Sequence, residues 1–100
     1  MIIVTRERNC ITVKGHAGYA EYGKDIVCAA VSALTYNLQE SINKLTEDTV
    51  GFSYASGEVI ISFGDISANT KLLIDSFIIG IEMIALSYPD NVELTRRECH

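Results

Sequence analysis

Cys28 and His16 are the two residues of this sequence whose types and positions suit nucleophilic catalysis. A cysteine thiolate attacks carbonyl carbons, and an imidazole within reach takes the thiol proton and later returns it to a leaving group. His16 lies in the segment that leads directly into the predicted helix bearing Cys28. This spacing permits contact between the two side chains without requiring it. The residues alone leave two interpretations open, a catalytic pair or an incidental loop histidine and a structural cysteine.

The predicted start of a helix at Asp25 favours a charged sulfur at Cys28. Aspartate is a favourable N-cap residue, and Cys28 follows it in the first helical turn. The unpaired backbone donors and partial positive charge of a helix N-terminus stabilise an anion there. The same backbone amides are positioned in principle to bind the oxyanion of a tetrahedral intermediate. Asp25 itself has two open roles, a helix cap, which is favoured, and a carboxylate that orients His16.

Two long amphipathic helices are predicted from apolar side chains at intervals of three and four residues. In the first helix, which begins at Asp25, these residues are Val27, Val31, Leu34, Leu38, Ile42 and Leu45. The second helix covers residues 67–88 and is stopped by Pro89. Its broad apolar face suits either a buried core or a dimer seam. The residues expected to form such a seam are Ile74, Ile78 and Ala85.

Short segments of alternating apolar and polar residues predict five strands. The strands are expected at residues 1–8, 10–14, 50–54 and 59–63 and around Val92 and Leu94. Ser56-Gly57 supplies the turn of the second of two hairpins. The predicted fold class is α/β in two layers, a mixed β-sheet with two main helices in the order ββαββαβ. One hundred residues suit a single domain spanning residues 1–100.

Residues 15–23 (GHAGYAEYG) form a predicted glycine-rich loop between the first hairpin and the first helix. Glycine gives a loop conformational freedom and lets a substrate backbone approach closely. The candidate substrate-loop residues are Gly15, Gly18, Tyr19, Tyr22 and Gly23. For the two tyrosines, which could line an apolar pocket, ordinary packing explains the sequence equally well. Without substrate, we expect this loop to hold His16 away from Cys28, so that substrate binding assembles the pair.

Composition and charge exclude several classes of function. The formal net charge of −5, with 8 Lys+Arg against 13 Asp+Glu and no basic run, disfavours direct nucleic-acid binding. The apolar stretch 72–86 is interrupted by Asp75 and Glu82 and is too short to cross a membrane. Cys10 and Cys99 complete an odd cysteine count without a CxxC pair, and no hydrophobic leader precedes the first strand. A cytoplasmic protein with reduced thiols, no metal and no cofactor is therefore expected.

The segment from Gly15 to Leu34 resembles the signature of the ribosomal-processing cysteine protease family Prp, also called the YsxB-like family. That signature is close to GHAxxxxxGxDIVCAxxSxL, and this sequence matches each specified position. The resemblance implies a homodimeric endopeptidase in which His16 and Cys28 form the catalytic dyad. It also implies the substrate, the N-terminal extension of large-subunit ribosomal protein number twenty-seven. Two alternatives remain open, a metal-binding module and a non-enzymatic ribosome-associated protein that binds a peptide without cutting it.

Overall fold

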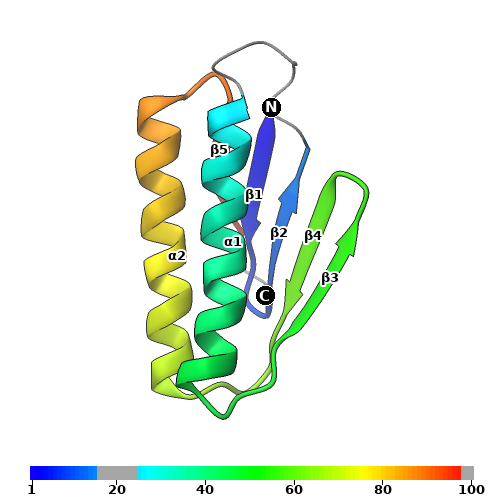
Figure 1. Ribbon diagram of the computed structural model, residues 1–100, viewed down its shortest axis with the longest axis vertical. Helices are drawn as coiled ribbons and strands as arrows, with labels where there is room; N and C mark the ends of the chain where they lie inside the picture. Colours follow the sequence, from blue (N-terminus) through cyan, green and yellow to red (C-terminus); the bar gives the residue numbers. More distant parts are fainter. Residues whose placement is uncertain (16–24, 98–100) are drawn as a thin grey trace.

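The protein folds into a five-stranded sheet and two long helices (Figure 1). The computed structural model describes residues 1–15 and 25–97. Its elements are β1 (Ile2–Arg6), β2 (Cys10–Lys14), α1 (Asp25–Leu45), β3 (Gly51–Ala55), β4 (Glu58–Ser62), α2 (Ala68–Ser87) and β5 (Val92–Arg96). This order and the mixed sheet confirm the predicted α/β fold class with the order ββαββαβ.

The sheet has the strand order β3-β4-β2-β1-β5. β1 pairs in parallel with β5, whereas the three other pairings are antiparallel. Both predicted hairpins are present, and Gly57 has the positive φ of 72° that its tight turn requires. Figure 1 shows α1 and α2 side by side, with the β3–β4 hairpin extending beyond them. That hairpin therefore lies to one side of the helix pair.

The predicted apolar stripe of α1 packs against the sheet. Its fully buried members are Val27, Val31, Leu38 and Ile42, and the hydroxyl of Thr35 donates a 2.8 Å hydrogen bond to the Val31 carbonyl. Leu45 was expected to belong to this stripe but is 68% exposed, because the last turn of α1 extends past the core. The stripe fixes the rotation of α1 about its axis, and with it the direction in which Cys28 points.

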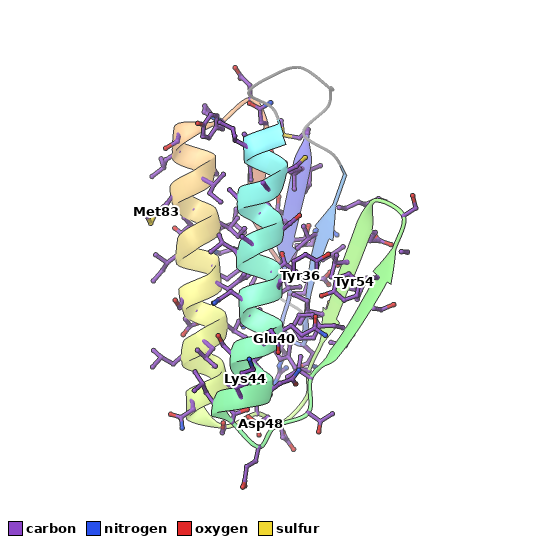
Figure 2. All side chains as sticks on the ribbon, viewed as in Figure 1. Tyr36, Glu40, Lys44, Asp48, Tyr54 and Met83 are labelled. Atoms are coloured by element: carbon purple, nitrogen blue, oxygen red, sulfur yellow. The ribbon has the colours of Figure 1, made fainter. Side chains whose placement is uncertain are left out.

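The core face of α2 differs from the prediction. Ile74 and Ile78 are 0% and 5% exposed within one chain, so the expectation that they form a dimer seam is wrong. Ala85, the third expected seam residue, is only half-buried and packs against the core. The opposite face of α2 carries the exposed apolar side chains Leu72, Ile79, Met83 and Leu86. Met83 points away from the rest of the molecule in Figure 2.

Asp48 joins the α1–β3 connection to the start of α2 (Figure 2). Its carboxylate accepts hydrogen bonds from the Ser67 amide at 2.9 Å, from the Ser67 hydroxyl at 2.7 Å and from the Thr70 hydroxyl. Ser67 is also the N-cap of α2, since its hydroxyl accepts from the Thr70 amide. The bonds from Thr70 and Ser67 hold the pKa of Asp48 below its ordinary value.

Neither helix is a membrane-spanning segment. In residues 1–15 and 25–97, no helix is both long enough and apolar enough to cross a bilayer. The charged residues Asp75 and Glu82, which interrupt the most apolar stretch, both lie in α2 and form ion pairs with Lys71 and Arg96.

Candidate active site

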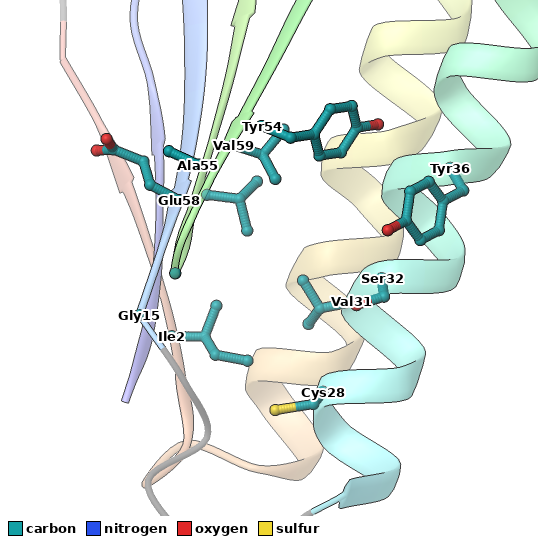
Figure 3. Close-up of a pocket in the computed structure, with 12 residues that line it drawn as sticks. Ile2, Gly15, Cys28, Val31, Ser32, Tyr36, Tyr54, Ala55, Glu58 and Val59 are labelled. Carbon is teal, nitrogen blue, oxygen red and sulfur yellow. The ribbon is translucent and has the colours of Figure 1, made fainter.

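Cys28 lies in the first turn of α1, which begins at Asp25. The neighbouring Val27 and Val31 are 1% and 3% exposed, and they anchor this turn in the core. Cys28 itself is half-buried, and its thiol points from α1 toward Ile2 of β1 (Figure 3). The thiol is thus held at the positive end of a long helix, on the side that faces the sheet.

Gly15 fixes the point at which the chain leaves β2 toward His16. Its φ is +100°, and an added Cβ would clash with the carbonyl oxygen of Met1. The Gly15 amide donates a 2.8 Å hydrogen bond to the Gly57 carbonyl in the β3–β4 turn. Glycine is required here both by the backbone conformation and by the close approach of the first residue of the chain.

The other predicted site residues lie at or beyond the limits of the described structure. Asp25 is the first residue of α1, and the structure describes its backbone but not its side chain. The predicted site residues outside the described ranges are His16, Gly18, Tyr19, Tyr22 and Gly23. The catalytic pair, the substrate loop and the separation of His16 from Cys28 therefore stay predictions.

A groove of about 260 Å³ runs from Cys28 between α1 and the β3–β4 hairpin (Figure 3). It is lined by Ile2, Val13, Gly15, Cys28, Val31, Ser32, Tyr36, Tyr54, Ala55, Gly57, Glu58 and Val59. Glu58 is the one charged residue in this set, and its carboxylate points away from α1 (Figure 3). The groove lining is therefore mostly apolar, with hydroxyl groups from Ser32 and Tyr36 on α1 and from Tyr54 on β3.

Two tyrosines meet across the groove, at the end away from Cys28 (Figures 2 and 3). The rings of Tyr36 on α1 and Tyr54 on β3 stack with their centroids 5.9 Å apart and their planes 23° apart. The hydroxyl of Tyr54 donates a hydrogen bond to Gln39. Burial raises the pKa of Tyr54, and the neighbouring Tyr36 raises it further.

Sequence reasoning did not single out this tyrosine pair. The sequence does indicate the position of Tyr36. It lies eight residues after Cys28, and residues spaced by four lie on the same side of a helix. Nothing in the sequence indicates that Tyr54 of β3 stacks on it.

A metal centre is not visible in the part of the chain that the structure describes. Within residues 1–15 and 25–97, no three His, Cys, Asp or Glu side chains gather closely enough to hold a metal ion. The chemistry that the described residues support is instead that of a thiol at a helix start beside a groove for a peptide-sized ligand.

Comparison with known proteins identifies this arrangement. A family model described as Cysteine protease Prp matches residues 1–93. The chain belongs to the cysteine protease Prp family. The Ribosomal processing cysteine protease Prp of Bacillus subtilis is 33% identical over 88 residues, which cover 81% of this chain and 79% of that protein. The Prp protein of Mycoplasma genitalium is 29% identical over 94 residues, which cover 92% of each chain.

Solved structures of two similar proteins share the fold. The essential ribosomal processing protease Prp from Staphylococcus aureus, in complex with a covalently linked product peptide, matches with a TM-score of 0.89 and 26% identity. This match covers 97% of this chain and 100% of the other. The SMU.848 protein from Streptococcus mutans matches with a TM-score of 0.83 and 30% identity, covering 98% of this chain and 93% of the other. The predicted family, fold and enzyme class are confirmed, and this chain is a Prp-type cysteine protease.

Proposed function

We propose that this protein is an endopeptidase that removes the N-terminal extension of large-subunit ribosomal protein number twenty-seven, using Cys28 and His16 as a catalytic dyad. The observation that carries the proposal is the Cys28 thiol, which opens on a peptide-sized groove in a chain of the Prp family. The relatives from Bacillus subtilis and Mycoplasma genitalium are named ribosomal processing proteases. The Staphylococcus aureus protein was also crystallised with a substrate peptide.

In this mechanism His16 takes the thiol proton, and the Cys28 sulfur attacks the carbonyl carbon of the scissile peptide bond. The carbonyl oxygen becomes an oxyanion, which the backbone amides at the start of α1 bind. The imidazolium of His16 then protonates the leaving amine as the C–N bond breaks. A water molecule hydrolyses the thioester, with His16 as its base, and the free thiol is restored.

The loop residues have supporting roles in this proposal. Asp25 caps α1 or orients the imidazole of His16. Gly18, Tyr19, Tyr22 and Gly23 contact the substrate, and its docking brings His16 to the thiol. Gly15 fixes the position at which this loop begins, because its amide donates a hydrogen bond to the Gly57 carbonyl.

The proposal is tested with the extended and the trimmed forms of the ribosomal protein. Each form is incubated with the enzyme, and its intact mass is measured. We expect the extended form to lose its extension while the trimmed form keeps its mass, and we expect Cys28→Ala to leave both unchanged. An extended form that binds the protein but keeps its mass would favour the alternative, a ribosome-associated peptide-binding protein.

We further propose that the protein is a cytoplasmic homodimer. The exposed face of α2, formed by Leu72, Ile79, Met83 and Leu86, supports the dimer, because these apolar side chains are between 58% and 83% exposed. In a twofold-symmetric dimer this face would pack against the same face of the second copy, and the exposed apolar side chains of both α2 helices would be buried. This seam lies on the side of α2 opposite to the residues expected from the sequence.

A further inference from the structure

The groove has a defined length and direction, because three of its lining residues follow one another along α1. Cys28, Ser32 and Tyr36 are spaced by four residues and lie on the side of the helix that faces the groove. Eight residues of helix advance by about 12 Å. An extended peptide advances by about 3.3 Å for each residue. The distance from the thiol to Tyr36 therefore corresponds to about three to four residues of a bound extended substrate.

The tyrosine pair forms the far limit of the groove. Tyr36 comes from the helical wall and Tyr54 from the strand wall, and their stacked rings span the space between them (Figure 3). The two residues are still 57% and 45% exposed, which leaves ring surface for a ligand to contact. The hydrogen bond from Tyr54 to Gln39 restrains the pair, so little side-chain freedom is lost when a ligand binds.

The apolar lining of the groove favours uncharged substrate side chains. Its floor and walls present Ile2, Val13, Val31 and Val59, while the carboxylate of Glu58 points away from α1. A charged substrate side chain placed beside these four residues would lose hydration, and the described lining offers it no charged partner other than Glu58. A large apolar side chain would instead gain by leaving water.

We propose that Tyr36 and Tyr54 form a specificity-determining subsite for a large apolar side chain of the substrate, about three to four residues from the scissile bond. This inference rests on the proposed function in one respect, namely that Cys28 is the nucleophile from which the distance is counted. The substrate segment beside it is extended and uncharged.

The experiment uses a pool of randomised dodecapeptides in two arms. In the first, wild-type protein cleaves the pool, and sequencing of the products gives the residue preference at each position from the cut. In the second, immobilised Cys28→Ala protein retains peptides, which are then sequenced. We expect Phe, Leu, Ile or Met to be enriched at one position three or four residues from the cut, and Asp, Glu and Lys to be depleted there.

Variants of the tyrosines assign the preference to the pair. With a preferred peptide, we expect Tyr36→Ala to lower kcat/KM by about tenfold through KM, with kcat unchanged. With the same peptide carrying Gly at the selected position, Tyr36→Ala should lower kcat/KM by less than about twofold. Tyr36→Phe keeps the ring and should restore the wild-type value. Tyr54→Ala tests the same subsite from the strand wall, and Tyr88→Ala, at the end of α2 and outside the groove lining, is the matched control.

The outcomes separate this inference from the proposed function. Peptides that are never cut, but are retained with an enrichment of large apolar residues that Tyr36→Ala abolishes, would overturn the protease assignment and leave the subsite standing. Cleavage with no positional enrichment, or with the same enrichment in both tyrosine variants, would overturn the subsite and leave the protease assignment standing. A pool that is neither retained nor cut would overturn both. Thermal melting of each variant identifies any loss of activity that comes from unfolding.

Discussion

The carboxylate of Asp48 accepts a hydrogen bond from the hydroxyl of Thr70, and this contact links the α1–β3 connection to the first turn of α2. Thr70 is fully buried, so the bond reaches from the surface into the core. Ser67 donates two further bonds to the same carboxylate. Asp48 therefore adds hydrogen bonds between the α1–β3 connection and α2 to the direct packing of the two helices.

The stability of the fold should depend on pH through Asp48. Its pKa is lowered in the folded protein by Thr70 first and Ser67 second, so the folded state favours the ionised carboxylate. The resulting stability is fully present above the unfolded pKa, near 3.8, and is lost as the pH falls from there through the lower folded pKa. We expect Asp48→Asn to lower Tm by several degrees at pH 7 and by progressively less below about pH 4. Asp90→Asn is the control, and an equal Tm decrease at pH 7 and pH 3 would contradict the assignment.

Cys28 should be the thiol that is alkylated most rapidly near neutral pH. It lies at the start of a long helix beside an open groove, so the sulfur is close to the helix N-terminus and accessible to the reagent. Brief iodoacetamide treatment followed by peptide mapping compares it with Cys10 and Cys99 in one sample. Faster labelling of either of those two residues would count against Cys28 as the nucleophile.

Gly15→Ala should impair both stability and activity. The substitution places a side chain at a φ of +100° and against the Met1 carbonyl, which should cost about 1–3 kcal/mol of unfolding free energy. It also shifts the origin of the segment that carries His16, so we expect kcat to fall further than the folded fraction does. Denaturant titration and peptide cleavage measure the two effects. Gly64→Ala is the matched control, because an added Cβ there meets nothing within 4 Å, and an equal effect of both variants would refute the role given to Gly15.

The outer face of α2 should control the oligomeric state. We expect wild-type protein at tens of micromolar to have the mass of a dimer by light scattering, and Met83→Glu to have the mass of a monomer. Leu45→Glu, which changes an equally exposed leucine at the end of α1, should stay dimeric. Monomeric wild-type protein would remove the proposal, and a dimer that survives Met83→Glu would place the seam elsewhere.

The sequence predicted the strands and helices well, because their patterns are local. The Ser56-Gly57 turn, the Ser67 start of α2 and the stop before Pro89 each depend on residues that are neighbours in the chain. The rotation of α2 was harder to predict. Apolar residues surround this helix on nearly every side, so periodicity does not decide which face meets the core, and contacts with α1 and the sheet place Ile74 and Ile78 inside.

For the site too, local features could be predicted from the sequence, whereas tertiary contacts could not. The position of Cys28 at a helix start follows from local sequence, and the structure agrees with it. The stacking of Tyr36 on Tyr54 depends on how the β3–β4 hairpin lies against α1, which is a tertiary contact with no local signal. The groove, which is built between these two elements, could not be predicted for the same reason.

The contact between the first residue of the chain and Gly15 has a practical consequence for making the protein. The Met1 carbonyl oxygen lies where a Cβ on residue 15 would be, and Ile2 lines the groove beside Cys28. A purification tag fused ahead of Met1 would therefore emerge next to the substrate site and compete with peptides for it. β5 runs parallel to β1, so its last residue, Arg96, lies at the opposite end of the sheet. An affinity handle that follows β5 would start from the end of the sheet away from Cys28, which makes it the better choice for enzymology and for ligand screening.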